Sequence, residues 1–371
     1  MRYIMMMIVL VAASLTISYG GDLDFRKVYP VSQGGTLYLN SEYGDLTINT
    51  SNRNEVVIEV KGLEEKNFKN LTVTQEGNSI RVSYRNRGGW SDDIEFNITV
   101  PAVYSLDIKT SAGDIDLTGN ITGNIKLNTS GGDIETKSIT GNLDAYTSGG
   151  NVKPGNVSGV ANIKTAGGNI VTGNIGGDAN FSTSGGNISI GNMAGAVKLS
   201  TAGGDIVAGT VNGTSVIKTS GGNINIVAIK GNSNVSTAGG SISVGATTAR
   251  LEARTSGGDL YINSLGSDAN LKTSAGEVTV KFSPSNTGNV SIKNSAGDVK
   301  LVFPGSTKAT VQATITAFGW DMEDDEVIRS DFPGTVDRRG GKVITRTAVN
   351  GGGGATVTVD LDMGTLSLKK N

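Results

Sequence analysis

Apolar and polar residues alternate along most of the chain, which is the pattern of a strand with one buried face. In Ile188–Ile190 the two isoleucines share one face and Ser189 takes the other. In Val197–Thr201 the apolar residues and the threonine alternate with Lys198 and Ser200. The same alternation recurs many times, and no helical period persists after residue 20. The pattern therefore predicts an all-β protein.

A repeat built around the string Thr-Ser-Gly-Gly, with small variations, organises the alternation. The first two copies are 19 residues apart, every later step up to Thr273 is 18, and a degenerate copy begins at Asn294. A fixed period of this kind indicates a stack of equivalent coils, or rungs, that bury their apolar faces together. The repeat threonines are Thr110, Thr129, Thr147, Thr165, Thr183, Thr201, Thr219, Thr237, Thr255 and Thr273. The register predicts inward side chains at Leu127, Ile163, Phe181, Val235 and Leu271, and outward side chains at Lys126, Asn162, Lys164, Asn180, Asn234, Glu252, Arg254 and Lys272.

Glycines mark the corners of each rung. One glycine follows each repeat threonine by three residues, and in most copies another stands nine residues later, so a rung divides into two halves, each a turn plus a strand of about five residues. We expect the first glycine to adopt a positive φ and the residue before it to need only a small side chain. The first set is Gly113, Gly132, Gly150, Gly168, Gly186, Gly204, Gly222, Gly240, Gly258, Gly276 and Gly297, and the second is Gly141, Gly159, Gly177, Gly195, Gly213 and Gly231.

A single rung cannot fold alone. It offers about four inward aliphatic side chains, worth ~1.5–3 kcal/mol each, against a backbone ordering cost of ~1–2 kcal/mol per residue. Stacking adds parallel strand hydrogen bonds and a continuous apolar column. We therefore predict a parallel β-solenoid with 18-residue rungs, expected to be right-handed, although the repeat does not itself decide the handedness or whether a rung has two sheets or three.

The segments that flank the array differ from it in composition. We expect a leader at 1–20, an N-terminal β segment at 21–104, the regular solenoid at 105–302 and a C-terminal β segment at 303–371. Both flanking segments are richer in charged and aromatic residues, which suits caps that block pairing at the open edges of a solenoid. Gly44–Ile48 resembles the repeat turn and strand, so the solenoid can begin there in irregular form. Strands are predicted at Thr36–Asn40, Leu46–Asn49, Val56–Lys61, Ser79–Tyr84, Glu95–Val100, Ala355–Asp360 and Thr365–Lys369.

The first twenty residues have the layout of a secretory signal peptide. Arg2 precedes an apolar run from Ile4 to Ile17, and small residues stand near Gly20. The run is short for a membrane-spanning helix, which needs ~20 residues, and an uncleaved anchor is the alternative. We expect an exported protein, in the periplasm, at the cell surface or outside the cell, with no membrane span in the mature chain.

Composition removes most familiar chemistry. Histidine and cysteine are absent, which excludes disulfides, Cys/His zinc sites and the Ser–His–Asp triad. The 32 basic and 34 acidic residues give a formal charge of −2, and this balance predicts neither a nucleic-acid partner nor binding to an anionic membrane.

Carboxylates are the remaining acid–base groups. Asp133 with Glu135, or Asp114 with Asp116, would be the pairs for polysaccharide cleavage, but rungs of constant length leave no long loops to wall a cleft. Calcium on the Asp/Asn turn positions or on the run Asp321–Glu326 is disfavoured, because the calcium-binding nonapeptide of other β-solenoids is not matched. We therefore predict no catalytic, cofactor-binding or metal-binding residue and no cofactor.

Three features together resemble a known family. Ile98–Ile115 combines a Val-Pro pair with the turn Thr-Ser-Ala-Gly-Asp, the array repeats Thr-Ser-Gly-Gly-Asn-Ile, and Asn350 opens a run of glycines. Over nearly all of the mature chain these features resemble the bacterial putative-adhesin family of β-strand repeats. The resemblance implies a parallel β-solenoid at or outside the cell envelope, and it implies no catalytic residues.

The leading hypothesis is an exported, non-enzymatic β-solenoid that serves as an adhesin-like structural or binding surface at the bacterial cell envelope. Its partner would be a surface glycan or an envelope protein of unknown identity. One alternative is a polysaccharide-processing β-solenoid enzyme that uses carboxylates, and another is an envelope scaffold that polymerises by end-to-end self-association.

Overall fold

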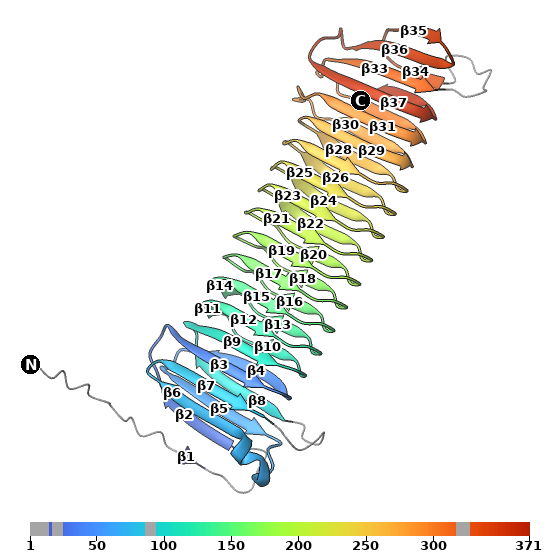
Figure 1. Cartoon of the computed structure of the whole chain (residues 1–371). Coiled ribbons are helices and arrows are strands. Elements are labelled where there is room, and N and C mark those ends of the chain that lie inside the picture. The colour runs from blue at the N-terminus through green and yellow to red at the C-terminus, as the bar shows by residue number, and fades with distance from the viewer. Residues whose placement is uncertain (1–14, 17–24, 86–93, 317–326) are drawn as a thin grey trace, which may run out of the picture. The chain divides into compact units, whose positions relative to one another are not determined.

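A computed structural model describes residues 15–16, 25–85, 94–316 and 327–371, whose regular elements are nearly all β-strands, most of them paired in parallel (Figure 1). The prediction of an all-β parallel solenoid is confirmed. The strands belong to two compact units, residues 1–158 and 159–371. Of the predicted leader, only Leu15–Thr16 is described, as strand β1 paired with β2. No helix in the described ranges has the length and hydropathy needed to cross a bilayer.

Unit 1 contains two parallel sheets and a short third one. Strands β9, β12 and β15 form one sheet, β10, β13 and β16 the second, and β11 with β14 the third. A short 3-10 helix, η1 (Glu65–Asn70), precedes β6. The strands are β2 (Phe25–Pro30), β3 (Gly35–Ser41), β4 (Asp45–Ser51), β5 (Glu55–Lys61), β6 (Leu71–Glu76), β7 (Ser79–Tyr84), β8 (Glu95–Pro101), β9 (Tyr104–Thr110), β10 (Ile115–Leu117), β11 (Ile121–Thr122), β12 (Ile125–Asn128), β13 (Ile134–Thr136), β14 (Ile139–Thr140), β15 (Leu143–Tyr146) and β16 (Val152–Pro154).

The N-terminal rungs of unit 1 are not stacked in chain order. Leu37 of β3 pairs with Leu106 of β9 on one side and with Ile80 of β7 on the other. In the same way β4 lies between β8 and β10. The rung made by β3 and β4 is therefore inserted between two rungs that the chain forms later. Antiparallel strands β6 and β5 then cover the outermost rung, and β2 covers β5.

All five strands predicted between residues 36 and 100 are confirmed, and Gly44–Ile48 is part of a true rung, since Leu46 pairs with Ile115. The prediction missed β2 and β6. Both are antiparallel strands at the N-terminal end of the stack with mostly half-buried or exposed side chains, so the alternation that marks a strand is weak in them.

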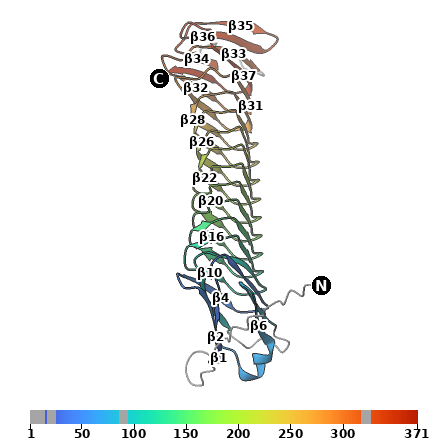
Figure 2. The same cartoon turned by 90° about the vertical axis from the view of Figure 1, so that its left-hand side faces the viewer.

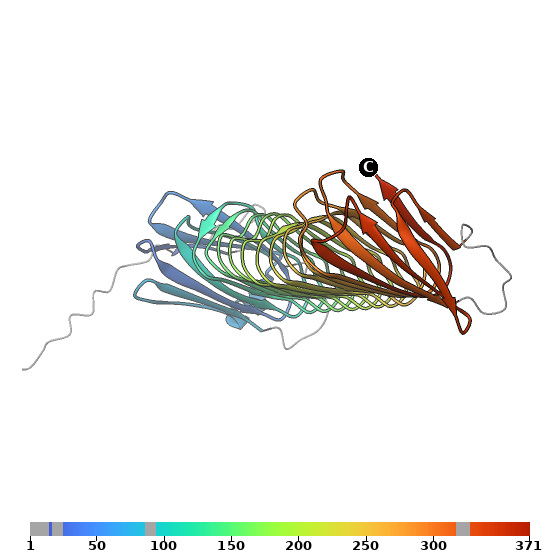
Figure 3. The ribbon, with the colours of Figure 1, turned by 90° about the horizontal axis from the view of Figure 1, so that it is seen from above.

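Unit 2 continues the same design in two sheets, which we call sheet A and sheet B. Side and top views show its successive coils following one path (Figures 2 and 3). Sheet A consists of β18 (Ile170–Thr172), β20 (Ile188–Ile190), β22 (Ile206–Val211), β24 (Ile224–Ile229), β26 (Ile242–Thr247), β28 (Leu260–Leu265), β30 (Val278–Phe282), β32 (Val299–Phe303), β38 (Leu366–Lys370) and β34 (Ile328–Ser330). Sheet B consists of β17 (Ala161–Lys164), β19 (Ala179–Ser182), β21 (Val197–Ser200), β23 (Ser215–Lys218), β25 (Ser233–Ser236), β27 (Leu251–Arg254), β29 (Ala269–Ala275), β31 (Val290–Ala296), β37 (Ala355–Met363), β33 (Ala309–Thr316), β36 (Lys342–Val349) and β35 (Gly334–Arg339).

The C-terminal end of unit 2 also departs from chain order. Val357 of β37 pairs with Val290 of β31 and with Val311 of β33, so the last long strand lies between two earlier ones. Strand β38 lies in the same way between β32 and β34. Antiparallel β36 and β35 finish the stack. The ring of Phe303 contacts those of Phe282 and Phe332, at centroid distances of 4.3 and 5.9 Å, and fills the wider core of this cap.

The inward and outward assignments of the repeat are confirmed. Ile188 and Leu199 are fully buried, and Phe181 is the large ring of the narrow core. The predicted strand length is wrong for many rungs, however. Strands β18 and β20 have three residues and β17, β19 and β21 have four, because the corners between the sheets take up more of each rung than a simple turn would.

Glycine is needed at the corners for a different reason from the one predicted. A positive φ occurs at Gly113, Gly276 and Gly297, but the equivalent glycines between them do not adopt it. A Cβ atom on Gly204 would instead lie 2.0 Å from the carbonyl oxygen of Gly186, the same position one rung earlier. The residue before it has room, since a Cβ on Gly203 would meet its nearest atom at 3.5 Å. Close stacking of rungs therefore excludes side chains at this corner.

The buried threonines hold the same corners together. The hydroxyl of Thr201 donates to the carbonyl of Gly186 at 2.8 Å and accepts the N–H of Gly204 at 3.3 Å. In the degenerate copy, Asn294 Nδ2 donates to the carbonyls of Gly276 and Gly297, both at 2.9 Å, and so keeps the bond to the previous rung, whereas the N–H of Gly297 donates to the carbonyl of Met363. The paired bonds recur at Thr129, Thr147, Thr183, Thr219, Thr237 and Thr255.

Candidate binding surface

The Asp and Asn residues that follow the glycine pair form a ladder of hydrogen bonds. In unit 1 the backbone N–H of Asp133 donates to Asp114 Oδ1 at 2.7 Å, and that of Asn151 donates to Asp133 Oδ1 at 2.6 Å. In unit 2 the N–H of Asp205 donates to Asn187 Oδ1 at 2.8 Å. These side-chain oxygens satisfy backbone donors at the rung corners, so they serve the stack.

The carboxylates considered for catalysis are paired differently from the prediction. Asp114 and Asp133 belong to the corner ladder, whereas Asp116 and Glu135 are direct neighbours on the parallel strands β10 and β13. Partial burial raises the pKa of Asp116, and the adjacent Glu135 raises it further. The groove described below contains none of these four residues.

No cluster of three or more metal-ligating side chains is found within residues 25–85, 94–316 and 327–371. The acidic run Asp321–Glu326, considered for calcium, lies outside the described residues.

A groove of about 620 Å³ lies on the outer face of sheet B in unit 2. It crosses strands β19, β21, β23, β25 and β27, and the residues at equivalent positions of these strands are direct neighbours from one rung to the next. The residues at its floor and walls are Asp178, Ala179, Asn180, Ala196, Val197, Lys198, Thr214, Ser215, Val216, Asn232, Ser233, Asn234, Arg250 and Glu252.

Two rungs of the groove carry serine at an inward position of sheet B. The first inward position of the strand is Ser215 in β23 and Ser233 in β25, where β27 carries Leu251. The hydroxyl of Ser215 donates to that of Ser233 at 2.6 Å, which in turn donates to the carbonyl of Gly231 at 2.9 Å. These two hydroxyls face the core and bond to one another there, so the polar side chains that a ligand in the groove can reach are those of the outward residues.

The groove offers hydrogen-bonding groups of both kinds. Asn180 and Asn234 carry amide donors and acceptors, and Asn234 Nδ2 donates to Glu252 at 3.4 Å, while Arg254 forms an ion pair with the same Glu252. No histidine exists in the chain to activate Ser215 or Ser233, both of which are buried. The arrangement is suited to holding a polar ligand by several weak bonds.

Sequence reasoning placed Asn180, Asn234 and Glu252 correctly on the outer face. It did not predict the groove, because the repeat treats every rung as equivalent. The sequence carries no clear signal for it, since the inward serines Ser215 and Ser233 face the core and not the groove.

Solved structures resemble this chain over most of its length, with low identity and low TM-scores. A putative adhesin from Bacteroides fragilis shares 10% identity, with 94% of this chain and 96% of that chain covered and a TM-score of 0.23. A putative cell adhesion protein from Clostridium sporogenes shares 11%, with 93% and 99% covered and a TM-score of 0.18. A putative lipid binding protein from Parabacteroides distasonis shares 15%, with 75% and 91% covered and a TM-score of 0.25.

No curated protein matches the chain. The profile of the Toastrack DUF4097 family, in contrast, matches residues 35–263 and 216–368, which together include the whole repeat array and most of both flanking segments. The resemblance drawn from the repeat turns is thereby confirmed, and the chain belongs to the Toastrack DUF4097 family.

Proposed function

We propose that this protein is an exported, non-enzymatic β-solenoid that binds an extended, hydroxyl-rich polymer at the bacterial cell envelope. The groove on sheet B carries the proposal, because the polar side chains of Asn180, Lys198, Thr214, Asn234 and Glu252 follow one another on successive rungs of an open face. Sugars are bound by such groups, through many individually weak hydrogen bonds. Export is supported by the signal-peptide pattern of residues 1–20.

Other features of the molecule favour binding over cleavage or polymerisation. The turn carboxylates already accept backbone N–H groups, so they are poorly placed as general acids or bases. Strand β35, which finishes the C-terminal cap, is exposed throughout and carries Asp337, Arg338 and Arg339. Charged edge strands of this kind discourage pairing with another copy.

The test is a panel of soluble glycans assayed for binding and for release of reducing ends. Asn180→Ala combined with Asn234→Ala should weaken binding to a retained glycan about tenfold, since two hydrogen bonds are lost. Asn225→Ala, an exposed amide on sheet A, is the matched control and should leave binding unchanged. Glycan cleavage by the wild type, or an equal effect of the control, would contradict the proposal.

A further inference from the structure

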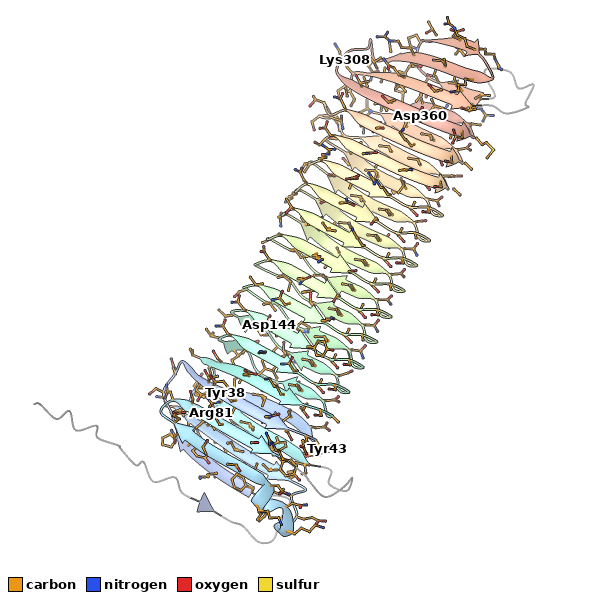
Figure 4. All side chains as sticks on the ribbon, in the orientation of Figure 1. Tyr38, Tyr43, Arg81, Asp144, Lys308 and Asp360 are labelled. Carbon is orange, nitrogen blue, oxygen red and sulfur yellow. The ribbon has the colours of Figure 1, made fainter. Side chains whose placement is uncertain are left out.

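A column of basic side chains runs along the outer face of sheet B in unit 2, beside the groove. It occupies the fourth strand position of successive rungs, where each residue is the direct parallel neighbour of the next. Five of its residues are basic and exposed, and Asp360, labelled in Figure 4, follows them in register. We call this set the basic column: Lys164, Ser182, Ser200, Lys218, Ser236, Arg254, Lys272 and Lys293.

Most of this positive charge is not neutralised within the protein. Arg254 pairs with Glu252, and Lys293 pairs with Asp360 at 3.4 Å with both side chains more than half exposed. Among the described residues, no carboxylate pairs with Lys164, Lys218 or Lys272.

Arg254, Lys272 and Lys293 stand on three consecutive rungs with nothing between them. Adjacent strands are ~4.8 Å apart, well inside the ~8 Å over which salt screens charges at physiological strength, so these cations repel one another. Like charges directly opposite in a sheet are destabilising. An anionic ligand that lies along the column would relieve this repulsion.

Over the repeat rungs of unit 2, sheet B is the more basic face. From β18 to β32 the outward positions of sheet A carry two charged residues, Lys281 and Lys300. The acidic residues of these rungs lie mostly at the corners, and Glu252 is the one on the outward face of β17 to β31; the corner residues are Asp178, Asp205, Asp259, Asp268, Glu277 and Asp298. The near-neutral net charge of the chain therefore averages over a locally basic face on sheet B.

The neighbours of the basic column indicate which anion it suits. Serine hydroxyls alternate with the cations at Ser200 and Ser236, and the amides of Asn180 and Asn234 lie one column away. No aromatic or large apolar side chain lies on this face between residues 160 and 296 except Val160 and Val216. Single-stranded nucleic acids use aromatic stacking and membranes use inserted apolar side chains, so both fit less well.

We propose that the basic column and the groove together bind a carboxylate-bearing polysaccharide, with the cations on its carboxylates and the amides and hydroxyls on its sugar hydroxyls. This inference rests on the proposed function and specifies the class of glycan. Arginine and lysine pair with carboxylates by charge-assisted hydrogen bonds. Because no carboxylate of the described residues pairs with Lys218 or Lys272, a ligand carboxylate can bind them without first breaking an internal ion pair.

The test uses the whole protein and three polymers: polygalacturonate, the same polymer fully methyl-esterified, and dextran. Polygalacturonate should bind at least tenfold more tightly than its ester at low salt, and the difference should shrink as salt is added. The triple variant Lys218→Gln/Arg254→Gln/Lys272→Gln should lose roughly tenfold in affinity for polygalacturonate. The control, Lys230→Gln/Lys281→Gln/Lys300→Gln, removes the same net charge from other positions of unit 2 and should bind as the wild type does.

The outcomes separate this inference from the proposed function. Equal binding of the acid and its ester, or an unchanged triple variant, overturns the basic column as a carboxylate site. If dextran still binds and the Asn180/Asn234 variant still fails to bind it, the proposed function stands without the inference. Tighter binding to duplex DNA or to vesicles of anionic phospholipid also overturns the choice of ligand. The melting temperature provides a check on folding, because the triple variant should melt no lower than the wild type once repulsion is removed.

Discussion

Replacing one glycine of a corner pair should be severe, whereas replacing the other should be harmless. Gly203 and Gly204 are adjacent, and neither adopts a positive φ, so alanine has no backbone strain at either site. They differ only in what the new methyl group meets. At Gly204 it would lie 2.0 Å from the carbonyl oxygen of Gly186, and at Gly203 the nearest atom is 3.5 Å away.

The cost at Gly204 follows from the bonds around the clash. Ordinary contact begins at 3.4 Å, so the two rungs must separate locally by about 1.4 Å. That shift breaks the 2.8 Å bond from Thr201 to Gly186 and the 2.8 Å bond from the Asp205 N–H to Asn187. Two buried or half-buried bonds at ~1–2 kcal/mol each, plus the strained stack, give a destabilisation of about 3–5 kcal/mol. Gly203→Ala should instead be neutral or stabilise by up to ~1 kcal/mol, because it restricts the unfolded chain.

Urea unfolding followed by circular dichroism measures the two free energies. Because a solenoid can open rung by rung, amide hydrogen exchange across residues 186–222 should accompany it and should show faster exchange there in Gly204→Ala alone. If Gly204→Ala unfolds within about 1 kcal/mol of Gly203→Ala, rung contact is not the reason for glycine at this corner.

Three further outcomes test other parts of the structure. Ile188→Asp places an unpaired charge in the fully buried column and should cost several kcal/mol, whereas Ser189→Asp on the opposite face should cost less than ~1 kcal/mol; equal shifts in melting temperature would refute the register. Burial raises the pKa of Tyr104, whose hydroxyl donates to the Asn78 carbonyl, to about 12. The folding stability that comes from keeping this hydroxyl neutral is therefore complete below about pH 10 and is lost between pH 10 and 12. Tyr104→Phe should therefore show about 2 kcal/mol less alkaline destabilisation at pH 11.5 in urea unfolding, and an identical pH profile would contradict the assignment. Truncation after Gly354 removes β37 and β38 from between their neighbours and should cause association in light scattering; a monomeric truncation product with the circular dichroism of the intact chain would show that the inserted rung is not needed.

Much of the solenoid could be predicted from the repeat because every rung meets the same surroundings. Once Ile188 is assigned inward, the equivalent residue of each rung must also face inward, since a slip by one residue would expose the whole column. The candidate surface was predicted only in part. Asn180 and Asn234 were placed outward correctly, but the groove that they line is formed by side chains of five different rungs, which come together only when the rungs are stacked.

The sequence alone determined the rung length, the register and the inward face, because these depend on a local period that repeats through the array. Tertiary structure decided the rest. Leu37 meets both Ile80 and Leu106, and Val357 meets both Val290 and Val311, through pairings between distant segments that no local pattern encodes. The reason for glycine at the corners and the gathering of cations on one face have the same origin, since both arise from contacts between residues one rung apart.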